Sequence, residues 1–534
     1  MTDRAPGGGE TLAQMLGGQC RRAPSAPAVI HGGATISYAD LEAMSRRVAA
    51  GLGRLGIGAG DRVAIWLPNV PAWLVLFLAC ARLGAIAVAL NTRFRSAEVG
   101  DILGRSGAKL LIMWPGFKGI DFTGILDAVD GAALAAIHRV IVYGHDAPSH
   151  VLGQRTVAYD DLARSPASHD RESGAAQSGC VMFTTSGTTK APKFVLHGQA
   201  GIVAHGRDVA ARFGYDRPAA KVLQAIPFCG VFGFTQAIGA LAGGAAMVTL
   251  PAFDAEAAAN AIRSHLITQV NGSDEMFARL LDACEEPHPF PTVAFAGYGN
   301  FSPELADIVV RAESRGLALV GLYGASEILA LYACQPPDAD VETRATMGGG
   351  LVSPRAAVRV RDPETGDLLG HGGIGELEAS GPSVMLEYFR NRQATAAALT
   401  ADGFVRTGDL GHTNADGSFT FLSRMGDVLR LGGFLVNPAE IEDHIQGHAM
   451  VEGCQVIGVQ GPRGLAPVAF VIPRPGAAFS EDALADHCRQ GMARFKVPAR
   501  IFPVPSFPTT TGPNGTKIQR AKLRVMAAEL IGKA

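Results

Sequence analysis

The sequence predicts an α/β protein. A large N-terminal domain of doubly wound α/β subdomains with a β-rich subdomain precedes a small, mobile α+β C-terminal domain. Three observations support this prediction. The chain has 534 residues, too many for one hydrophobic core. Short apolar runs alternate with helix-like segments through the first three-quarters of the chain, which is typical of parallel sheets. From about Ala356 the strands become shorter, and Gly and Asp turns separate them.

The first three-quarters contain eight short apolar runs that predict buried strands. These runs are Val63–Leu67, Ala85–Leu90, Lys109–Met113, Val140–Tyr143, Val181–Phe183, Ala246–Leu250, Val293–Ala296 and Ala318–Leu322. Between them, segments such as Tyr38–Leu55 and Pro303–Arg315 carry apolar residues at helical spacing. This alternation is what predicts the doubly wound part.

The last part of the chain predicts two further units. Turns at Asp362–Gly372 and Asn414–Ser418 indicate an antiparallel or barrel-like subdomain. A boundary near Arg424–Asp427 divides the chain into residues 1–424 and residues 425–534. The second unit has the size of a separate lid-like domain. Its predicted strands are Gln455–Val459 and Val468–Val471, and its predicted helices are Ala439–His444 and Glu481–Met492.

Composition excludes several classes of protein. The net charge of -2 argues against a nucleic-acid binder, which needs a basic surface. Eight scattered cysteines without a C-x-x-C pair predict reduced thiols in a cytoplasmic protein rather than disulfides or a zinc site. The first ten residues have no apolar core and predict no signal peptide.

The apolar stretch from Pro71 to Leu90 is long enough to resemble a membrane span. Arg82 and Gly84 divide it into a helix-like piece, Ala72–Leu83, and a strand-like piece. We therefore predict a buried helix that leads into a buried strand, and no transmembrane segment. Oligomeric state, monomer or homodimer, is left open by the sequence.

The most informative segment is Phe183–Lys193, which reads Phe-Thr-Thr-Ser-Gly-Thr-Thr-Lys-Ala-Pro-Lys. It follows a predicted buried strand and crowds hydroxyls, backbone N–H groups and two ammonium groups into a single loop. Such a loop suits a polyphosphate. The alternative is an ordinary polar surface turn. The usual nucleotide-binding order G-x-x-x-x-G-K-[ST] is absent from the chain.

Two further motifs follow strands. Leu322–Glu327 combines an aromatic ring, a hydroxyl and a carboxylate, which could stack on a base, meet a phosphate and hold Mg²⁺. Arg406–Leu410 places Asp409 after a Gly turn, where it could accept two ribose hydroxyls. The alternative for each is a solvated or turn-stabilising residue.

Three motifs lie at or beyond the predicted boundary. Arg424–Asp427 supplies a guanidinium, Leu431–Glu442 begins with a diglycine before a helix, and Gly512–Arg520 is a glycine-rich loop with a single lysine. Taken separately, these are an ordinary surface Arg, a hairpin bend and a solvated Lys.

Taken together, the motifs resemble those of the adenylate-forming superfamily of acyl-CoA synthetases, firefly luciferases and peptide-synthetase adenylation domains. Their order and spacing carry the resemblance, which covers essentially the whole chain. It begins at Thr35–Leu41, continues through Leu83-Gly84-Ala85 and Leu90–Arg93, and ends at Lys517 and the following Leu523-Arg524.

The resemblance implies the site residues. Tyr323 and the Gly297-Tyr298-Gly299 turn would bracket the adenine, next to Gly324. Ser326 would replace the usual Thr, and Asp409 and Arg424 would hold the ribose. The implied catalytic residues are Lys517, Glu327, which would also carry Mg²⁺, and Thr185. The loop around the β- and γ-phosphates would comprise Thr184, Thr185, Ser186, Gly187, Thr188, Thr189 and Lys193.

The implied reaction has two halves. A carboxylate first attacks the α-phosphorus of ATP, and pyrophosphate leaves. Since two anions meet, positioning and charge neutralisation dominate this step. The thiol of coenzyme A then attacks the acyl-adenylate, and AMP leaves. Relatives rotate the small domain between the halves, which would withdraw Lys517 and place Gly432-Gly433 against a pantetheine tunnel.

Four departures from the superfamily pattern stand out. The first is in the phosphate loop, where Lys190 and Phe194 occupy positions at which relatives usually have Gly. The second is the hinge residue, which is Gly426. The Lys517 loop is preceded by Pro-Asn and is longer than usual. In addition, the predicted acyl pocket of Phe228, Gly230 and Phe234 has Gly230 where relatives place an aromatic residue or His. A missing ring should widen the pocket.

The leading interpretation is an acyl-CoA synthetase for a hydrophobic acid, either medium- or long-chain, branched or cyclic, with ATP, Mg²⁺ and coenzyme A. Alternatives are an adenylating enzyme that passes the acyl group to a carrier protein and a luciferase-like oxygenase. A protein that only holds a nucleotide is a third. Retention of both Glu327 and Lys517 argues against this third class.

Overall fold

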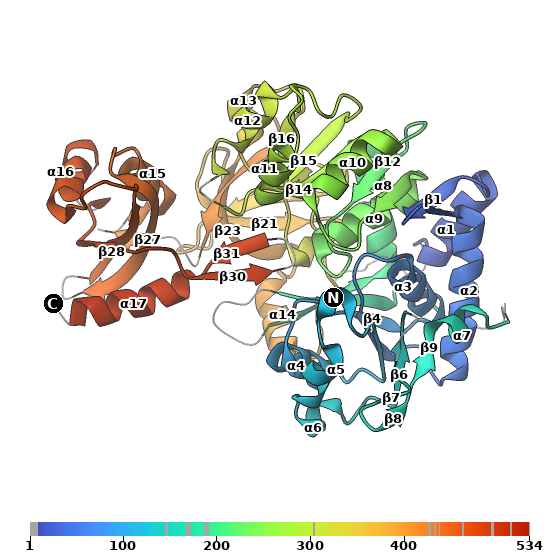
Figure 1. The fold of residues 1–534 in the computed structure, drawn as a ribbon. Helices are drawn as coiled ribbons and strands as arrows, with labels where there is room; N and C mark the ends of the chain where they lie inside the picture. The colour runs from blue at the N-terminus through green and yellow to red at the C-terminus, as the bar shows by residue number, and fades with distance from the viewer. Residues whose placement is uncertain are drawn as a thin grey trace.

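The computed structural model has two large sheets on one side and a smaller C-terminal unit on the other (Figure 1). The described residues are 9–144, 148–166, 172–185, 192–302, 305–425, 429–431, 434–436, 438–461, 464–492, 496–512 and 515–532.

The first sheet has eight strands with a parallel centre. Strands β10, β4, β3, β5, β6 and β9 run parallel, and β11 and β22 add an antiparallel edge. In spatial order the strands are β22 (Glu387–Tyr388), β11 (Phe194–Gly198), β10 (Gly179–Thr184), β4 (Ile86–Ala89), β3 (Arg62–Trp66), β5 (Leu110–Met113), β6 (Arg139–Val142) and β9 (Val157–Ala158).

The second sheet has fourteen strands, which are mostly parallel in one half and antiparallel in the other. Its first half is mostly parallel and comprises β2 (Ala34–Ser37), β1 (Pro27–His31), β13 (Ala246–Thr249), β12 (Lys221–Gln224), β14 (Gln269–Ser273), β15 (Phe295–Gly299) and β16 (Leu319–Tyr323). Its second half is antiparallel and comprises β17 (Ala333–Cys334), β18 (Gly348–Leu351), β24 (Phe419–Arg424), β23 (Val405–Thr413), β21 (Gly375–Ser380), β19 (Ala357–Arg361) and β20 (Leu368–Leu369).

All strands predicted in the first three-quarters of the chain are present. The antiparallel half of the second sheet confirms the predicted change to short strands separated by turns after about Ala356. The prediction for Val293–Ala296 is displaced, because β15 starts at Phe295 and continues through the glycines to Gly299. A predicted helix over Pro303–Arg315 is shorter, since α12 spans Ile308–Ser314.

One apolar core joins the two large sheets. The helices α2 (Tyr38–Arg54), α3 (Pro71–Leu83), α8 (Gln199–Phe213) and α9 (Val231–Gly243) share a buried cluster with strands of both sheets. Helices α10 (Ala255–His265), α11 (Asp274–Asp282) and α12 form a second core with the parallel half of the larger sheet. The site described below therefore rests on two sheets with a common interior.

The C-terminal unit has cores of its own. A three-stranded sheet contains β27 (Val451–Gly461), β28 (Gly464–Pro473) and β29 (Arg500–Pro503). Around it lie α15 (Pro438–Gln446), α16 (Glu481–Gly491) and α17 (Arg520–Gly532), along with the hairpin of β25 (Leu429–Leu431) and β26 (Phe434–Val436). The boundary between residues 424 and 425 stays a prediction, because residues 426–428 lie outside the described part.

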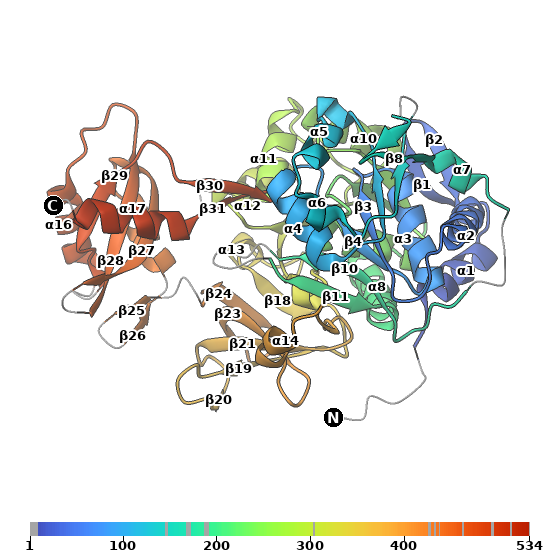
Figure 2. The same cartoon turned by 90° about the horizontal axis from the view of Figure 1, so that it is seen from below.

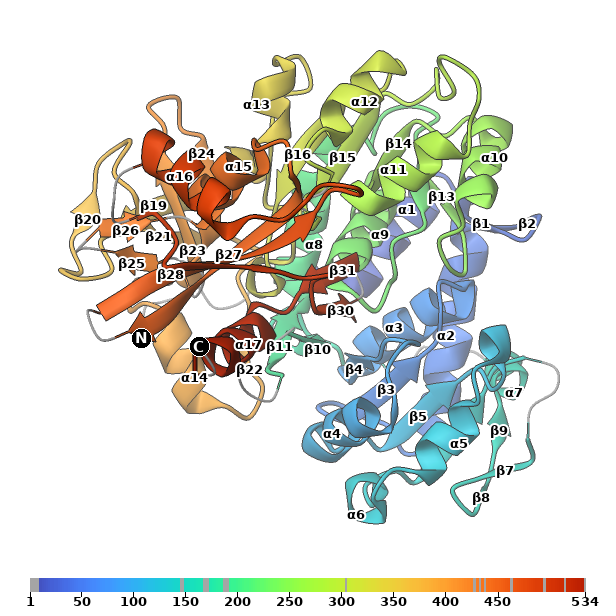
Figure 3. The same cartoon turned by 60° about the vertical axis from the view of Figure 1, so that its left-hand side comes forward.

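A second hairpin of the C-terminal unit joins β30 (Thr509–Gly512) to β31 (Gly515–Ile518). This hairpin points from the C-terminal unit toward the large sheets (Figures 1, 2 and 3). Lys517 lies on β31.

Within the described residues, no helix combines the length and apolar character needed to cross a membrane. Helix α3 begins with Pro71 in its first turn and ends at Gly84, which has a left-handed φ of 67°. Arg82 is 2% exposed and lies inside the core. Its guanidinium pairs with Glu42 and Glu172, and its Nε donates to Ser45 Oγ at 3.0 Å.

Replacing Arg82 should test this buried ion network. Arg82→Met leaves Glu42 and Glu172 without their buried cation, so we expect the free energy of unfolding to fall by about 3 kcal/mol in urea titrations. Arg46 contacts the same two carboxylates but is a quarter exposed, so Arg46→Met should cost less than about 1 kcal/mol. Equal losses in the two variants would contradict the assignment.

Candidate functional site

The base of the predicted phosphate loop is a closed hairpin. Strands β10 and β11 pair antiparallel up to Thr184 and Phe194. One residue further, the backbone N–H of Thr185 donates to the Lys193 carbonyl at 3.0 Å, and the Lys193 N–H donates to Thr185 Oγ1 at 3.1 Å. Thr184, Thr185 and Lys193 therefore lie together at the end of a buried strand. Ser186, Gly187, Thr188, Thr189 and Lys190 lie outside the described residues.

Phe194 anchors one end of this loop. Its ring is buried in the core of the first sheet, and the Arg105 guanidinium carbon lies 4.3 Å from the ring centre. Arg105 Nη2 also donates to the Pro192 carbonyl at 2.7 Å. The departure from Gly at position 194 therefore has a physical reason: the ring and the arginine hold the outgoing chain of the loop.

The turn after β16 carries Ser326 and Glu327 in a tight conformation. A Cβ at Gly324 would lie 2.5 Å from the Cα of Ala330, so only glycine fits there. Leu329, Ala330 and Leu331 all have left-handed φ values, 58°, 46° and 41°. Such conformations cost free energy and persist only where neighbouring contacts impose them.

Two buried histidines impose that conformation. His197 Nε2 lies 2.7 Å from the Ser326 carbonyl, and His205 Nε2 lies 2.9 Å from the Ala330 carbonyl. Burial lowers the pKa of each imidazole to about 4, so both are neutral at pH 7 and donate to the turn. Sequence patterns did not single out either histidine, because each acts on a segment more than a hundred residues away.

Glu327 is tied to the phosphate-loop lysine through Tyr388. The Tyr388 hydroxyl donates to Glu327 Oε1 at 2.7 Å, and Lys193 Nζ lies 4.5 Å from the centre of the same ring. Strand β22 places Tyr388 beside Val195 of β11. Burial, together with the neighbouring Glu327 carboxylate, raises the pKa of the Tyr388 phenol. No sequence motif points to Tyr388, whose strand is only two residues long.

Asp409 is held in a similar way. The Tyr323 hydroxyl donates to Asp409 Oδ2 at 2.6 Å, and Arg424 Nη1 lies 3.0 Å from Asp409 Oδ1. Strands β23 and β24 place Asp409 and Arg424 directly opposite each other. Burial raises the pKa of the Asp409 carboxyl, and the Arg424 guanidinium opposes that shift.

The predicted adenine-binding residues lie at the ends of neighbouring parallel strands. Gly297 and Gly299 are on β15, and Tyr323 ends the adjacent β16. Where Gly297 would carry a side chain, the Asn271 amide oxygen and a Leu322 methyl group already fill the space. Ligands of open α/β sheets bind at such carboxyl ends.

The predicted acyl-pocket residues lie at the start of α9. Gly230 precedes the helix as its N-cap residue. Phe228 and Phe234 are buried within an aromatic cluster, with ring centres 5.5 Å and 6.2 Å from Trp73. Phe234 also lies 5.1 Å from Phe183, which leads into the phosphate loop. The cluster thus adjoins that loop, and its role as an acyl pocket stays a prediction.

The C-terminal candidates are described only in part. Lys517 is placed on β31 by its backbone. Gly426, Gly432 and Gly433 lie outside the described residues, so the hinge and the coenzyme A contacts stay predictions. Among the residues that the structure describes, no group of three or more His, Cys, Asp or Glu side chains could hold a metal ion on its own.

The closed loop base, the two carboxylates held by tyrosines and the paired arginine are groups that suit a phosphorylated ligand. Residues 17–389 match the AMP-binding enzyme family, and residues 440–512 match the AMP-binding enzyme C-terminal domain. The chain therefore belongs to the AMP-binding enzyme family, within the adenylate-forming superfamily that its motifs predicted. It is an enzyme of the acid–thiol ligase class.

Similar proteins extend over nearly the whole chain. A feruloyl-CoA synthase of Amycolatopsis is 30% identical, covering 92% of this chain and 94% of its own. A methyl-dioxo-octahydro-indenyl propanoyl:CoA ligase of Mycobacterium tuberculosis is 31% identical over 96% and 99%. The ATP-bound structure of MatB from Rhodopseudomonas palustris has a TM-score of 0.83 at 26% identity, over 96% and 98%.

The buried histidines predict a pH-dependent stability. Their pKa is about 4 in the folded chain and 6.5 when unfolded. The unfolded chain therefore binds more protons between these values, and the free energy of unfolding falls as the pH falls through this window. Each histidine should contribute about 1.4 kcal/mol per pH unit there. Urea unfolding of the parent and His197→Gln at pH 7.5, 6.5 and 5.5 measures this contribution. An unchanged pH slope in the variant would contradict it.

Proposed function

We propose that the chain is an ATP-dependent acyl-CoA synthetase that activates a hydrophobic carboxylic acid through an acyl-adenylate. The observation that carries this proposal is the convergence of Glu327, Asp409 and Lys193. Their loops come from separate strands, yet Tyr388 links Glu327 to Lys193, and Tyr323 sits in the same turn as Glu327 while holding Asp409. Such an arrangement suits a nucleotide whose ribose and triphosphate must be bound simultaneously.

The first half-reaction is attack of the acid carboxylate on the α-phosphorus of ATP. The oxygen–phosphorus bond to the acid forms as the bond to pyrophosphate breaks. Lys193 and the hydroxyls at the loop base would receive the β- and γ-phosphates. Asp409 would accept the ribose hydroxyls with one carboxylate oxygen while Tyr323 and Arg424 fix its orientation.

The residues present fit a magnesium ion. Mg²⁺ in nucleotide enzymes is commonly held by one or two carboxylates together with substrate phosphates, rather than by a cage of protein ligands. Glu327 supplies one such carboxylate, and Tyr388 occupies only its Oε1. When bound there, the ion would neutralise phosphate charge as pyrophosphate leaves.

Lys517 would complete the first half-reaction from the C-terminal unit. Its hairpin points toward the large sheets in all three views (Figures 1, 2 and 3). The whole chain also matches the ATP-bound form of MatB better than the apo form, with TM-scores of 0.83 and 0.74 at the same 26% identity. We infer that this arrangement corresponds to the adenylating state.

The second half-reaction would follow rotation of the C-terminal unit about Gly426. The thiol sulfur of coenzyme A attacks the acyl carbonyl carbon, the thioester bond forms, and AMP leaves with the electron pair of the broken carbon–oxygen bond. Gly432 and Gly433 would line the approach of the pantetheine chain. The names of the Amycolatopsis and M. tuberculosis relatives, both coenzyme A ligases, support coenzyme A as the acceptor.

The acid is proposed to be bulky and apolar. Both of those relatives are named for ring-bearing acids, and Gly230 leaves the start of α9 without a side chain beside the aromatic cluster of Trp73, Phe228 and Phe234. The cluster supplies the apolar surface that a ring or a branched chain prefers.

The proposed function is tested by pyrophosphate release with a panel of acids, with and without coenzyme A. We expect cyclic, branched or medium-chain acids to exceed acetate and propionate, and thioester to appear only with coenzyme A. Lys517→Ala should lower adenylation well beyond about tenfold, a barrier increase above ~1.4 kcal/mol. Preference for acetate, or a smaller effect of Lys517→Ala, would contradict the proposal. Adenylate without thioester would favour a carrier protein as acceptor, and light emission an oxygenase.

Tyr388 is predicted to position Glu327. Tyr388→Phe removes the hydroxyl but keeps the ring beneath Lys193, so the carboxylate loses the donor that orients it. Partners that orient a metal ligand in this way typically contribute about tenfold or more to metal affinity. We therefore expect about tenfold weaker Mn²⁺ binding in the presence of ATP, measured by electron paramagnetic resonance, with a matching loss of kcat/KM.

Tyr332→Phe is the matched control for this measurement. The Tyr332 hydroxyl is also buried and donates to the carbonyls of Ala357 and Ser380, at 3.0 Å and 2.7 Å, without contacting Glu327. Its removal should leave Mn²⁺ affinity unchanged. If both variants bind Mn²⁺ as the parent does, Tyr388 has only a structural role.

A further inference from the structure

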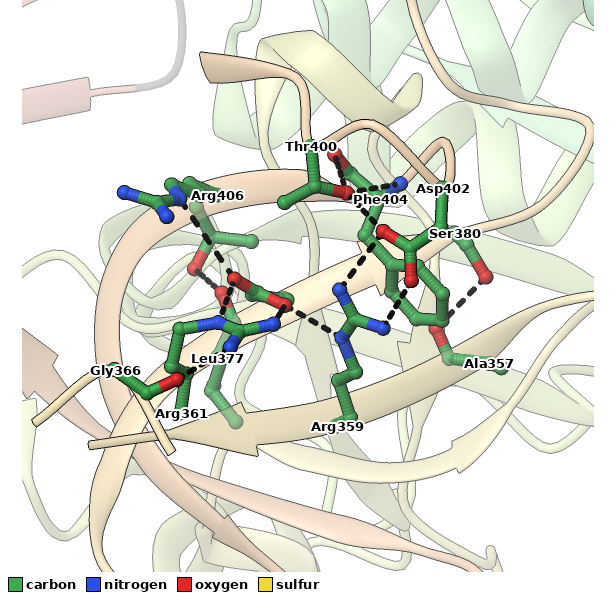
Figure 4. Close-up of polar contacts among 12 residues, drawn as sticks. Ala357, Arg359, Arg361, Gly366, Leu377, Ser380, Thr400, Asp402, Phe404 and Arg406 are labelled. Carbon is green, nitrogen blue, oxygen red and sulfur yellow. Dashed lines mark hydrogen bonds and ion pairs between the residues drawn. The ribbon is translucent and has the colours of Figure 1, made fainter. Parts of the chain in front are cut away.

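A cavity of about 570 Å³ lies in the antiparallel half of the larger sheet. One wall is formed by three arginines: Arg359 and Arg361 on β19, and Arg406 on β23. Figure 4 shows these three side chains reaching across neighbouring strands, with Thr400 and Asp402 beside Arg359. None of these residues belongs to the site described above.

The arginines surround one buried carboxylate. Glu378 of β21 is fully buried, and it accepts hydrogen bonds from Arg359 Nε at 2.5 Å and from Arg361 Nε at 2.6 Å. Arg359 also makes a two-pronged pair with Asp402, at 2.5 Å and 3.0 Å. Arg359 and Arg361 are therefore both hydrogen-bonded to carboxylates.

Arg406 makes a looser contact than the other two arginines. Its Nε is 3.7 Å from Glu378 Oε1, which is an ion pair rather than a hydrogen bond, and half of its side chain is exposed. Within the described residues, no hydrogen bond is found for its two terminal nitrogens, whereas Arg361 Nη1 already donates to the Gly366 carbonyl at 2.5 Å. The next carboxylate along β21, Glu376, accepts from the Gly408 N–H and does not line the cavity, although it is close enough to interact with the charge of Arg406.

Part of the cavity lining is apolar. It is formed by Ala396 and Ala397 at the end of α14 (Arg392–Ala398) and by Leu399 in the following loop. A guanidinium with free, coplanar donors binds carboxylates and phosphates through two parallel hydrogen bonds. The apolar wall adds surface for a small hydrocarbon group next to the anion.

We propose that this cavity is a second ligand site, which binds a small organic anion. Arg406 takes the carboxylate or phosphate group of the ligand, Arg361 and Arg359 hold the wall in place through Glu378, and Ala396, Ala397 and Leu399 receive the apolar part. The site is independent of the proposed synthetase reaction, because it shares no residue with the nucleotide site.

Binding is tested on the full chain with two probes, benzoate and phenyl phosphate, by saturation-transfer NMR. A stable acyl-sulfamoyl adenosine fills the nucleotide and acyl sites during the measurement, so that probe binding there is blocked. We expect at least one probe to bind under these conditions, more weakly as NaCl is raised. Binding of phenyl phosphate alone assigns the site to phosphate monoesters, and binding of benzoate alone assigns it to carboxylates.

The variants Arg406→Gln and Arg406→Lys locate the probe. Loss of a charged, two-pronged contact should raise the Kd about tenfold in Arg406→Gln and less in Arg406→Lys, which keeps the charge. The matched control is Arg392→Gln. Arg392 is an exposed arginine at the start of α14 and does not line the cavity. It should bind the probe as the parent does.

Two results would overturn the proposal. The first is that neither probe binds once the nucleotide site is filled. The second is that the parent and Arg406→Gln bind the probe with equal Kd values. Either result would mean that the arginines only connect neighbouring strands. Should Arg406→Gln fail to fold, Arg406→Lys and the salt dependence of the parent decide between these outcomes.

Discussion

Two carboxylates, each held by a tyrosine hydroxyl, are the feature on which the rest of the site depends. In the proposed nucleotide site, Glu327 and Asp409 would both face a polyanion, where free carboxylates would rotate away or protonate. A neutral phenol is the donor that fixes such a group without cancelling its charge. Tyr388 and Tyr323 play this part. Glu327 is held by the protein at Oε1, whereas both oxygens of Asp409 are contacted, Oδ2 by Tyr323 and Oδ1 by Arg424.

These pairs also connect the two sheets. Tyr388 lies on the edge strand of the first sheet, while Glu327 follows a strand of the second. His197 crosses the same junction from β11 to the turn that carries Ser326. The proposed nucleotide site thus takes residues from both sheets, and buried polar contacts between the sheets help to fix its geometry.

Much of this architecture could be predicted from local patterns. Apolar runs located the parallel strands, and the ordered motifs identified the superfamily and most of the groups that the structure brings together, including Asp409 with Arg424 and Thr185 with Lys193. Residues whose role depends on distant pairing could not be found in this way. Tyr388 sits in a two-residue strand, and His197 and His205 act on a segment that is remote in sequence. Phe194 departs from the sequence pattern for a reason that only the structure shows, because Arg105 lies over its ring.

The turn from Tyr323 to Leu331 also bears on how the enzyme can change. Three successive residues in a disfavoured backbone region store free energy that a relaxed turn would release. Selection for heat resistance alone would favour glycine at these positions, or a rearranged loop. Either change would loosen the segment that aims Glu327. Under the proposed role of Glu327, stability and activity therefore compete at this turn, and stabilising substitutions are better placed elsewhere in the fold.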